Sequence, residues 1–291
     1  MNALASIRSV AVAPGFATRS LPEHVAALAE QSLQLEVHTW PKPGLVSHVD
    51  TGSHTDMDAD TFLRSGSAIR PFFAELVEAG MRNGDMAELR RIGLRAEFAM
   101  LRATGGINTH RGAIFGMGLL CAAAGLRLAG HADAGISLGD AVAKRWARGI
   151  VDGPYLLYSH GQAAARDFGA GGARQQAASG FPCVYEVGLP ALHNAFALAP
   201  GDAEAARVQA IFALIAVLED TNLLHRGGLT GLQFAQQSAQ SFLDRGGIGQ
   251  PDWRRVARAT HRAFVERRLS PGGAADLLAM SLFVEAFSAS I

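Results

Sequence analysis

Ile114-Phe-Gly-Met-Gly-Leu-Leu-Cys-Ala-Ala-Ala124 is the stretch of sequence that decides the fold class. It contains no charged residue, and a second apolar run follows at Ile211 to Leu218. Both runs are shorter than the roughly 20 residues that a helix needs to cross a bilayer. We therefore predict that they are buried core helices and that the protein has no membrane partner.

The rest of the chain predicts an all-α fold. Ala, Leu, Glu and Arg recur at helical spacing, whereas alternating strands rich in Val and Ile are nearly absent. We expect one multi-helical globular domain over residues 20–291, with a polar cleft lined by inter-helix loops, after a loose N-terminal segment of residues 1–19. The predicted helices are Leu21 to about Glu36, Ala59 to Ala79, Asp85 to Ala103, His110 to Leu128, Ser137 to Arg148, Ala203 to Leu218, Leu229 to Leu243, Asp252 to Phe264 and Gly272 to Ser288.

Two segments depart from the helical pattern. Ser20 and Glu23 form a capping box that starts the first helix, but the Pro-Lys-Pro sequence at 41–43 forbids its continuation. An irregular loop is therefore expected from Trp40 to Asp58. Residues 149–201 are rich in Gly and Pro and are the least periodic. They predict a mobile flap or a subdomain junction.

The composition excludes several function classes. Lys plus Arg number 26 and Asp plus Glu number 26, so no net positive field attracts nucleic acid or an anionic membrane. The only cysteines, Cys121 and Cys183, lie in apolar surroundings that suit reduced thiols rather than a disulfide framework. These features predict a cytoplasmic protein without a nucleic-acid partner, in which any polyanion must bind a local basic cluster.

The first polar block lies in the loop after the first helix. Lys42 between two prolines has a stiffened backbone, which suits an ammonium aimed at a phosphate; the alternative is a solvated loop lysine. His54, Asp56 and Asp58 offer ligands on alternate residues, a pattern compatible with Mg²⁺ shared with a nucleotide triphosphate. Asp58 has a competing role as a helix cap.

The second block, residues 104–112, is a glycine-rich turn that leads into a helix. Such a turn exposes backbone N–H groups at the positive end of the helix dipole, which makes an anion site. His110 and Arg111 would add side-chain donors. The block lacks the Lys-Ser/Thr pair of a P-loop. The alternative is an ordinary helix start capped by Asn108 or Thr109.

The third block, residues 219–228, follows the apolar helix that is predicted to end at Leu218. If that helix continues, Thr221 and His225 share one of its faces and Asp220 lies beside them. A carboxylate at a helix C-terminus is disfavoured by the dipole unless a cation compensates. Asp220 is therefore a candidate ligand, and a plain surface ion cluster is the alternative.

The fourth block begins at Arg267. Ser270 before Pro271 predicts a helix cap followed by the first helical residue. Asp276 then stands alone in an otherwise apolar run. A buried carboxylate rarely stays unpaired, so its partner is expected to be an arginine, a metal or a substrate.

Taken together, the four blocks resemble the triphosphoribosyl-dephospho-CoA synthase family, which serves citrate lyase and malonate decarboxylase. The resemblance covers Glu36 to Phe283, nearly the whole chain. The matching text, in order, is PKPGLVSHVDTGSHTDM at 41–57, TGGINTHRGAIFGMGLLCAAAG at 104–125, DTNLLHRGG at 220–228 and RRLSPGGAADLLA at 267–279.

The resemblance implies an all-α enzyme that transfers the triphosphoribosyl group of ATP to the ribose 2′-hydroxyl of 3′-dephospho-CoA and releases adenine. The product is the precursor of a prosthetic group that is later attached to an acyl carrier protein. Many members carry an Arg-Gly-Glu-Ala-like block where this chain has Arg174-Gln-Gln-Ala177. A carboxylate role at Gln176 is thereby excluded, and we predict that the departure marks the malonate decarboxylase branch.

The implied chemistry assigns expected roles to the four blocks. Breaking the ribose–adenine bond builds positive charge at the anomeric carbon, so carboxylates are needed there, and the departing base needs a proton. The expected catalytic residues are Asp56, Asp220, Asp276, Glu36 and His110, and Asp56, Asp220 and Asp276 are also the expected ligands of Mg²⁺. The expected substrate-binding residues are Lys42, Asn108, Thr109, Arg111, Arg226, Arg268 and Ser270.

Two other functions stay open from the sequence. A nucleotide N-glycohydrolase would use similar carboxylates but let water attack the sugar. A non-catalytic helical adaptor would leave the polar blocks as capped turns and would not consume ATP. The sequence also leaves a homodimer open.

Overall fold

The computed structural model of the protein describes residues 20–154 and 171–290. Within these residues every regular element is a helix and there is no strand, which confirms the all-α prediction. The predicted loose segment 1–19 and residues 155–170 of the predicted flap lie outside the described residues. The helices are α1 (Leu21–Val37), α2 (Ala59–Met81), α3 (Met86–Thr104), α4 (Arg111–Leu128), α5 (Leu138–Val151), α7 (Gly172–Ala178), η2 (Cys183–Gly188), α8 (Leu189–Leu198), α9 (Ala203–Val217), α10 (Thr221–Asp244), η3 (Gly247–Gly249), α11 (Trp253–Glu266) and α12 (Gly272–Ser290).

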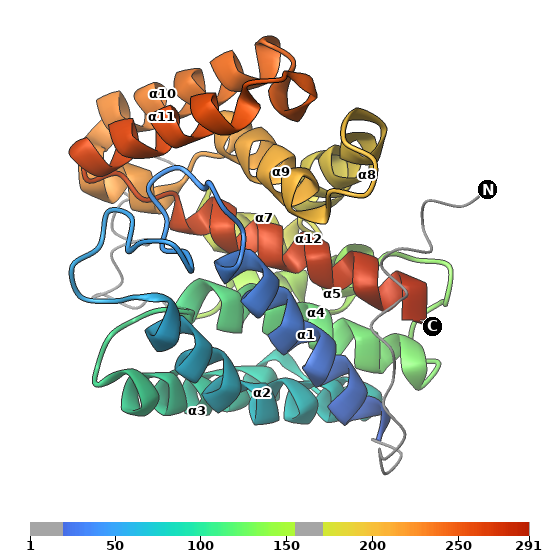
Figure 1. Ribbon diagram of the computed structural model, residues 1–291. Helices are drawn as coiled ribbons and strands as arrows, with labels where there is room; N and C mark the ends of the chain where they lie inside the picture. The colour runs from blue at the N-terminus through green and yellow to red at the C-terminus, as the bar shows by residue number, and fades with distance from the viewer. Residues whose placement is uncertain (1–19, 155–170, 291) are drawn as a thin grey trace, which may run out of the picture.

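Helices from the two ends of the chain lie side by side at the centre of the fold. α12 packs against α1, α4 and α9, and Figure 1 shows it crossing α1 between two outer layers. α2 and α3 form the layer below, with α2 packed on α1 and α4, and α10 and α11 form the layer above. The loop after α1 therefore reaches the turn between α11 and α12, where Ser53 Oγ donates a hydrogen bond of 2.6 Å to the Leu269 carbonyl.

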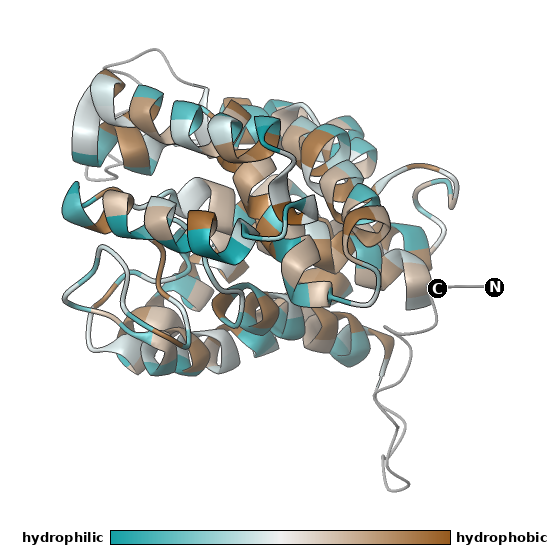
Figure 2. Cartoon of the chain, turned by 45° about the horizontal axis from the view of Figure 1, so that its top comes forward, coloured by the Kyte–Doolittle hydropathy of each residue, from teal (hydrophilic) through white to brown (hydrophobic). Residues whose placement is uncertain are grey.

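The core is centred on α4, as the apolar run at 114–124 predicts. Most of its residues are fully buried, including Met117, Leu120 and Cys121, whereas the outer helices carry hydrophilic residues on one side (Figure 2). α2 and α4 approach closely because Gly80 has no side chain. A Cβ at this position would come within 1.9 Å of the Ala122 carbonyl oxygen. The second predicted core run lies in α9, whose Ile211, Phe212 and Leu214 are also fully buried.

Two of the described helices, α4 and α12, are long and apolar enough to cross a membrane by length and composition alone. Length therefore does not exclude a span, contrary to the sequence argument. Burial distinguishes the two, since 72% of the apolar window of α4 lies inside the fold, against 50% of that of α12. It is this burial that identifies α4 as a core helix.

The structure differs from the sequence analysis in two places. The apolar helix α9 ends at Val217, close to its predicted end at Leu218. The alternative that it continues through 219–228 is wrong, because a new helix starts at Thr221 with Asp220 as its N-cap. α10 then bends at Gly228, whose φ of 60° and ψ of −161° interrupt the helical backbone. The second difference lies within residues 171–198, where the structure has the helices α7, η2 and α8 that the sequence did not predict. Their short helices and their Gly and Pro content hid the periodicity. The flap or subdomain junction in this region stays a prediction.

Candidate active site

Lys42 is completely buried and does not face solvent. Its Nζ donates hydrogen bonds to Glu36 Oε1 at 2.5 Å and to the Glu36 carbonyl at 2.7 Å. Burial lowers the pKa of Lys42, and the Glu36 charge opposes that shift. Burial likewise raises the pKa of Glu36, opposed by Lys42. The solvated-lysine alternative is therefore excluded, and the ammonium is paired with a carboxylate of its own chain.

The loop that carries Lys42 is anchored from α11. His261 Nδ1 donates a 2.6 Å hydrogen bond to the Lys42 carbonyl, and its Nε2 lies 3.3 Å from Asp50 Oδ1. The edge of the same imidazole packs on the Trp40 ring. His261 is a buried polar residue that sequence reasoning missed, because it lies inside an amphipathic helix without any recognisable motif. The loop is thus part of the protein interior.

Asp220 joins the first turns of two helices. Its Oδ1 accepts hydrogen bonds from the N–H groups of Asn222 at 2.8 Å and Leu223 at 3.4 Å, and its Oδ2 accepts one from Ala274 at 3.0 Å. Burial raises the pKa of Asp220, and these backbone hydrogen bonds lower it. Asp220 is therefore at a helix N-terminus, where the dipole favours a carboxylate, and not at the C-terminus that the sequence suggested.

Asp276 lies one turn into α12 and faces the start of α4. A Cβ at Gly112 would come within 2.0 Å of Asp276 Oδ2, so only a glycine lets the carboxylate approach so closely. The pKa of Asp276 lies well above its usual range, chiefly because of burial, and the charges of Glu36 and Asp220 raise it further. A backbone hydrogen bond with Ala113 opposes these effects. The structure thus brings together three of the predicted catalytic carboxylates, those of Glu36, Asp220 and Asp276.

Three helix N-termini meet at this carboxylate cluster. α10 starts at Asp220, α12 reaches the same side chain through the Ala274 N–H, and α4 starts beside Asp276 at Gly112. Each N-terminus carries a partial positive charge and N–H groups without helical partners. These helix starts stabilise the two buried carboxylates of the protein, because the N–H groups of Asn222, Leu223 and Ala274 donate to Asp220 and that of Ala113 donates to Asp276.

Arg226 lies beside the loop that follows α1. Its Nη1 donates hydrogen bonds to the carbonyl oxygens of Ser53 at 3.2 Å and Arg268 at 3.1 Å. Its Nη2 is 3.3 Å from His54 Nδ1. Burial lowers the pKa of Arg226 and the charge of Asp56 raises it. The guanidinium is fixed in place by backbone oxygens, whereas the Arg268 side chain is exposed.

His54 connects this arginine to the start of α12. Its Nε2 is hydrogen bonded to Ser270 Oγ at 2.9 Å, and its Nδ1 is 3.6 Å from Asp56 Oδ1. Burial lowers the pKa of His54, followed by the Arg226 charge. Asp56 itself is exposed, and Asp58 caps α2 by accepting a 2.8 Å hydrogen bond from the Thr61 N–H. The structure therefore places Asp56 in a cluster next to the three buried carboxylates rather than among them.

The glycine-rich turn before α4 is held mainly by local contacts. Asn108 Oδ1 accepts a 3.2 Å hydrogen bond from the Arg111 N–H. The N-cap of α4 is His110, without a side-chain cap hydrogen bond, so the prediction of Asn108 or Thr109 as the cap is wrong. Arg111 Nε is paired with Glu97 Oε2 at 2.9 Å. The turn thus keeps its glycines exposed at 105 and 106 while its side chains satisfy one another.

His110 ends this turn and is buried. Its Nδ1 is hydrogen bonded to Ser65 Oγ at 2.7 Å, and Thr109 Oγ1 donates to the same oxygen at 2.7 Å. Burial lowers the pKa of His110 to about 3. The imidazole is therefore neutral at physiological pH and cannot carry a proton toward a substrate without a change in its surroundings.

The described residues contain no group of three or more His, Cys, Asp or Glu side chains arranged to hold a metal ion. Mg²⁺ usually binds one or two carboxylates together with substrate phosphates and water. Asp276 and Asp220 fit that mode, since Asp276 is a carboxylate with no cationic partner among the described residues. Asp56 does not belong to the same pair.

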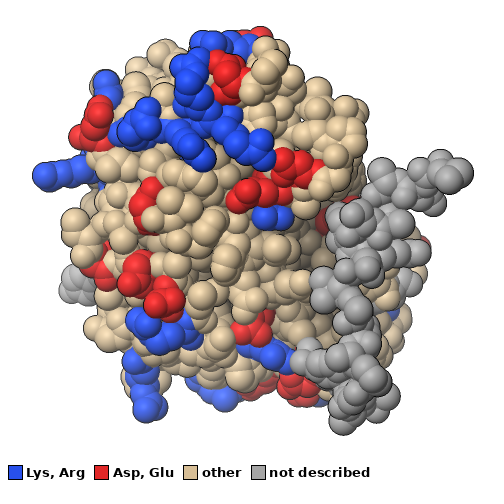
Figure 3. Space-filling model, in the orientation of Figure 1, with Lys and Arg blue, Asp and Glu red and all other residues tan. Residues whose placement is uncertain are grey.

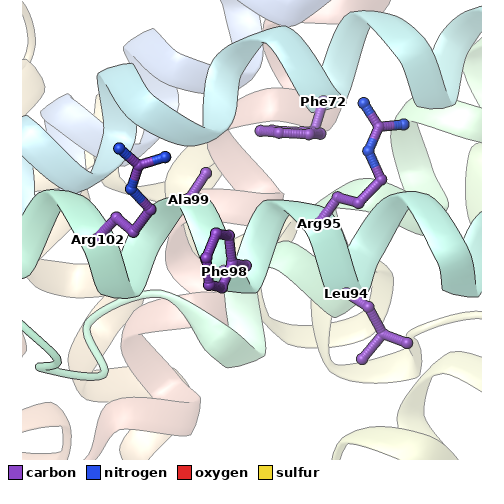
Figure 4. Close-up of a pocket in the computed structure, with 6 residues that line it drawn as sticks. All are labelled: Phe72, Leu94, Arg95, Phe98, Ala99 and Arg102. Carbon is purple, nitrogen blue, oxygen red and sulfur yellow. The ribbon is translucent and has the colours of Figure 1, made fainter.

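The surface hollows and charges lie in different places. A hollow of about 400 Å³ between α2 and α3 is apolar apart from Arg95 and Arg102, and none of the predicted site residues lines it (Figure 4). On the face seen in Figure 3, basic side chains gather over α10 and α11. The net neutral chain thus has a basic region on the layer that contributes Arg226.

Fold and site together define an all-helical enzyme whose buried carboxylates lie at converging helix N-termini and can stabilise a cation-like sugar. The family comparison agrees with this class. The chain belongs to the ATP:dephospho-CoA triphosphoribosyl transferase family, whose model matches residues 22–290. This confirms the resemblance that the four polar blocks carry.

Three curated relatives match most or all of the chain, and each is named "probable 2-(5″-triphosphoribosyl)-3′-dephosphocoenzyme-A synthase". The relative from Pseudomonas putida is 40% identical over 274 residues, which cover 91% of this chain and 95% of the relative. One from Vibrio cholerae serotype O1 (strain M66-2) is 36% identical over 93% of this chain and 90% of the relative. One from Pseudomonas paraeruginosa is 37% identical over 100% of this chain and 98% of the relative. No solved structure matches the chain.

Proposed function

We propose that this protein transfers the 5-triphosphoribosyl group of ATP to the ribose 2′-hydroxyl of 3′-dephospho-CoA and releases adenine. The hydroxyl oxygen bonds to the anomeric carbon, the bond from that carbon to adenine breaks, and the hydroxyl proton ends on adenine. The observation that supports this proposal is the meeting of Asp220 and Asp276 at three helix N-termini. One arrangement thus places carboxylates for the sugar beside the positive ends of three helices, whose dipoles favour the nearby phosphates.

In this proposal the carboxylates of Asp276 and Asp220 face the ribose of ATP. Positive charge that develops at the anomeric carbon is stabilised by carboxylates that are already desolvated and fixed by backbone hydrogen bonds. Because these carboxylates are already in position, no free energy is spent on rearranging them or the surrounding water as the reaction proceeds. The logic parallels glycoside chemistry with two carboxylates, with a ribose hydroxyl in place of water.

The triphosphate is proposed to lie along the start of α4 and toward Arg226. The N–H groups at the start of that helix, near Gly112, have no helical partners. The Arg226 guanidinium is fixed by backbone oxygens, and a fixed fork matches phosphate oxygens. Arg268 and Ser270 lie in the segment just before α12. Lys42 contributes by holding Glu36 and the loop, not by contacting phosphate.

Magnesium is part of the proposal. Asp276 and Asp220 would hold it together with the triphosphate, because they are the adjacent carboxylates that lack a cation. When bound, the ion would neutralise phosphate charge. A metal titration by calorimetry, with and without ATP, checks this assignment: Asp276→Asn should weaken Mg²⁺ binding in the presence of ATP, whereas Asp56→Asn should leave it unchanged.

One assay tests the whole proposal. The protein is incubated with ATP and Mg²⁺, with and without dephospho-CoA, and adenine and the mass of the acceptor are measured. We expect adenine only when dephospho-CoA is present, together with a matching gain in acceptor mass. Adenine without the acceptor would indicate an N-glycohydrolase, and absence of both ATP binding and adenine would indicate an adaptor.

Three further expectations from the sequence belong to the proposal. We place the protein in the cytoplasm. We also place it in the malonate decarboxylase branch, because Gln176 stands in the block before Gly-Phe-Pro. A homodimer is proposed as one state of the protein in solution. Sedimentation equilibrium checks the mass against 30.6 kDa for one chain.

A further inference from the structure

A second hollow, of about 320 Å³, lies between α7 and the connection from α9 to α10. Gln175 and Gln176 of α7 line one side, and Val217, Leu218 and Glu219 line the other. Its size lies within the range of small-molecule pockets, about 300 to 1,000 Å³. We infer that this hollow binds the adenine ring of ATP, an inference that rests on the proposed function.

The hollow adjoins the carboxylates on which the proposed reaction depends. Glu219 in its wall directly precedes Asp220, and Asp220 lies close enough to Asp276 for its charge to raise the pKa of that residue. Adenine is bonded directly to the anomeric carbon that the carboxylates face. The base must therefore occupy a space next to Asp220, and this hollow is bounded by Glu219, the residue that precedes it.

The two glutamines in the wall have different roles. Gln176 is committed to the protein, since its Nε2 donates to Cys183 Sγ at 3.1 Å and its Oε1 accepts from the Cys183 N–H at 3.2 Å. Gln175 is exposed, and its amide has no hydrogen-bond partner among the described residues. It lies against Gly171, where a Cβ would come within 1.6 Å of its Oε1. The free amide at the edge of the hollow is thus that of Gln175.

A glutamine amide is complementary to adenine. Its oxygen accepts from the 6-amino group while its NH₂ donates to N7, the pairing by which Gln and Asn read adenine in other contexts. Hypoxanthine presents an oxygen at position 6, so the same amide would face two acceptors and could satisfy one. Val217 and Leu218 offer apolar surface for the ring face. The hollow should therefore prefer ATP over ITP.

Adenine is present in both substrates, because dephospho-CoA carries an adenosine whose 2′-hydroxyl is the acceptor. Kinetics distinguish the two sources. In Gln175→Leu we expect the KM for ATP to rise about tenfold while the KM for dephospho-CoA changes less than twofold. The preference of wild type for ATP over ITP in kcat/KM, expected to be at least tenfold, should fall toward unity in this variant.

Two other variants complete the test. Gly171→Ala keeps the amide but displaces it, so a smaller rise in the KM for ATP is expected. Gln237→Leu, at an exposed glutamine of α10 outside the hollow, is the control and should behave as wild type. A rise in the KM for dephospho-CoA alone, or no change in either KM or in the ATP/ITP ratio, would overturn the inference.

Failure of the proposed function gives a different result. If wild type produces no adenine from ATP and dephospho-CoA, the proposed transfer is wrong. Calorimetric titration with ATP and ITP then tests the hollow by itself, without catalysis. Weaker ATP binding in Gln175→Leu than in Gln237→Leu would support the adenine site, and equal affinities would reject it.

Discussion

The loop after α1 and the turn before α4 are both polar, rich in Gly or Pro, and predicted from the sequence to bind phosphate. In the loop, the Lys42 ammonium is buried and paired with Glu36. The Lys42 carbonyl is hydrogen bonded to His261, which lies more than 200 residues further along the chain. In the turn, Asn108 and Arg111 are satisfied by residues nearby in sequence, and the glycines stay exposed. The same kind of sequence thus produces an interior element in one place and a surface element in the other.

The difference shows which of the two segments a ligand can reach. A buried ion pair contributes through the fold, because its charges are already desolvated and paired. An exposed turn at a helix start still has backbone N–H groups to offer. We therefore expect substitutions in the loop to act mainly on stability, and those next to the turn to act mainly on activity.

Lys42→Met should give the largest effect on the stability side. Removing the ammonium leaves Glu36 buried without its partner, which should cost about 3–5 kcal/mol of the free energy of unfolding. Urea unfolding followed by circular dichroism measures it. Lys144→Met, at an exposed lysine of α5, is the control and should stay within about 0.5 kcal/mol of wild type.

The double variant Glu36→Gln/Lys42→Met sharpens this test, since it removes both charges together. We expect it to recover part of the lost stability, and the double-mutant cycle isolates the pair energy. If Lys42→Met lost less than about 1 kcal/mol, the loop would not be an interior element and the comparison with the turn would fail.

Asp276→Asn should give the largest effect on activity, because this carboxylate lies between the two segments. On the loop side the charge of Glu36 raises the pKa of Asp276, and on the turn side the Asp276 carboxylate packs against Gly112. We expect adenine release to fall about 10²- to 10³-fold. Glu285→Gln, a carboxylate change on the same helix, should leave the rate unchanged.

Asp276→Asn should lose activity without losing stability. Its folded-state pKa is raised, so the ionised form costs free energy above the ordinary pKa of an aspartate. At pH 7 the variant should be equally or more stable, by on the order of 1 kcal/mol. A variant that lost activity through unfolding would contradict the assignment.

His110→Asn tests the buried end of the turn through its pH dependence. The pKa of His110 is about 3 in the folded protein and about 6.5 in an unfolded chain. The neutral imidazole therefore makes its full contribution to the free energy of unfolding above pH 6.5. That contribution is lost as the pH falls toward 3, because the unfolded chain takes up the proton first. Wild type should lose up to about 1.4 kcal/mol more per pH unit below 6.5 than the variant. Parallel pH profiles of unfolding would contradict it.

How much could be predicted from the sequence follows the same division. The all-α class and the core run at 114–124 were predicted correctly, because helical periodicity is local. The cap of α4 was not, since it is His110 and neither Asn108 nor Thr109. Asp220 and Asp276 were candidates from their places in the sequence, and the resemblance added expected roles for Glu36 and Asp56. The structure brings Glu36, Asp220 and Asp276 together and leaves Asp56 exposed outside that group. The Lys42 environment, His261 and the double cap by Asp220 could not be predicted, because each depends on contacts between distant helices.

Asn108→Ala should give the smallest effect and marks the other end of the comparison. Its Oδ1 accepts one hydrogen bond, from the Arg111 N–H, at an exposed helix start. Losing one hydrogen bond costs about 0.5–1.5 kcal/mol, and exposure to water favours the lower value. Urea unfolding should therefore show a loss near 0.5 kcal/mol, while the KM for ATP should rise only a few-fold, because the backbone N–H groups of the turn remain. A loss comparable to that of Lys42→Met would mean that the turn is as much part of the interior as the loop, and a ligand could not reach its backbone without unfolding it.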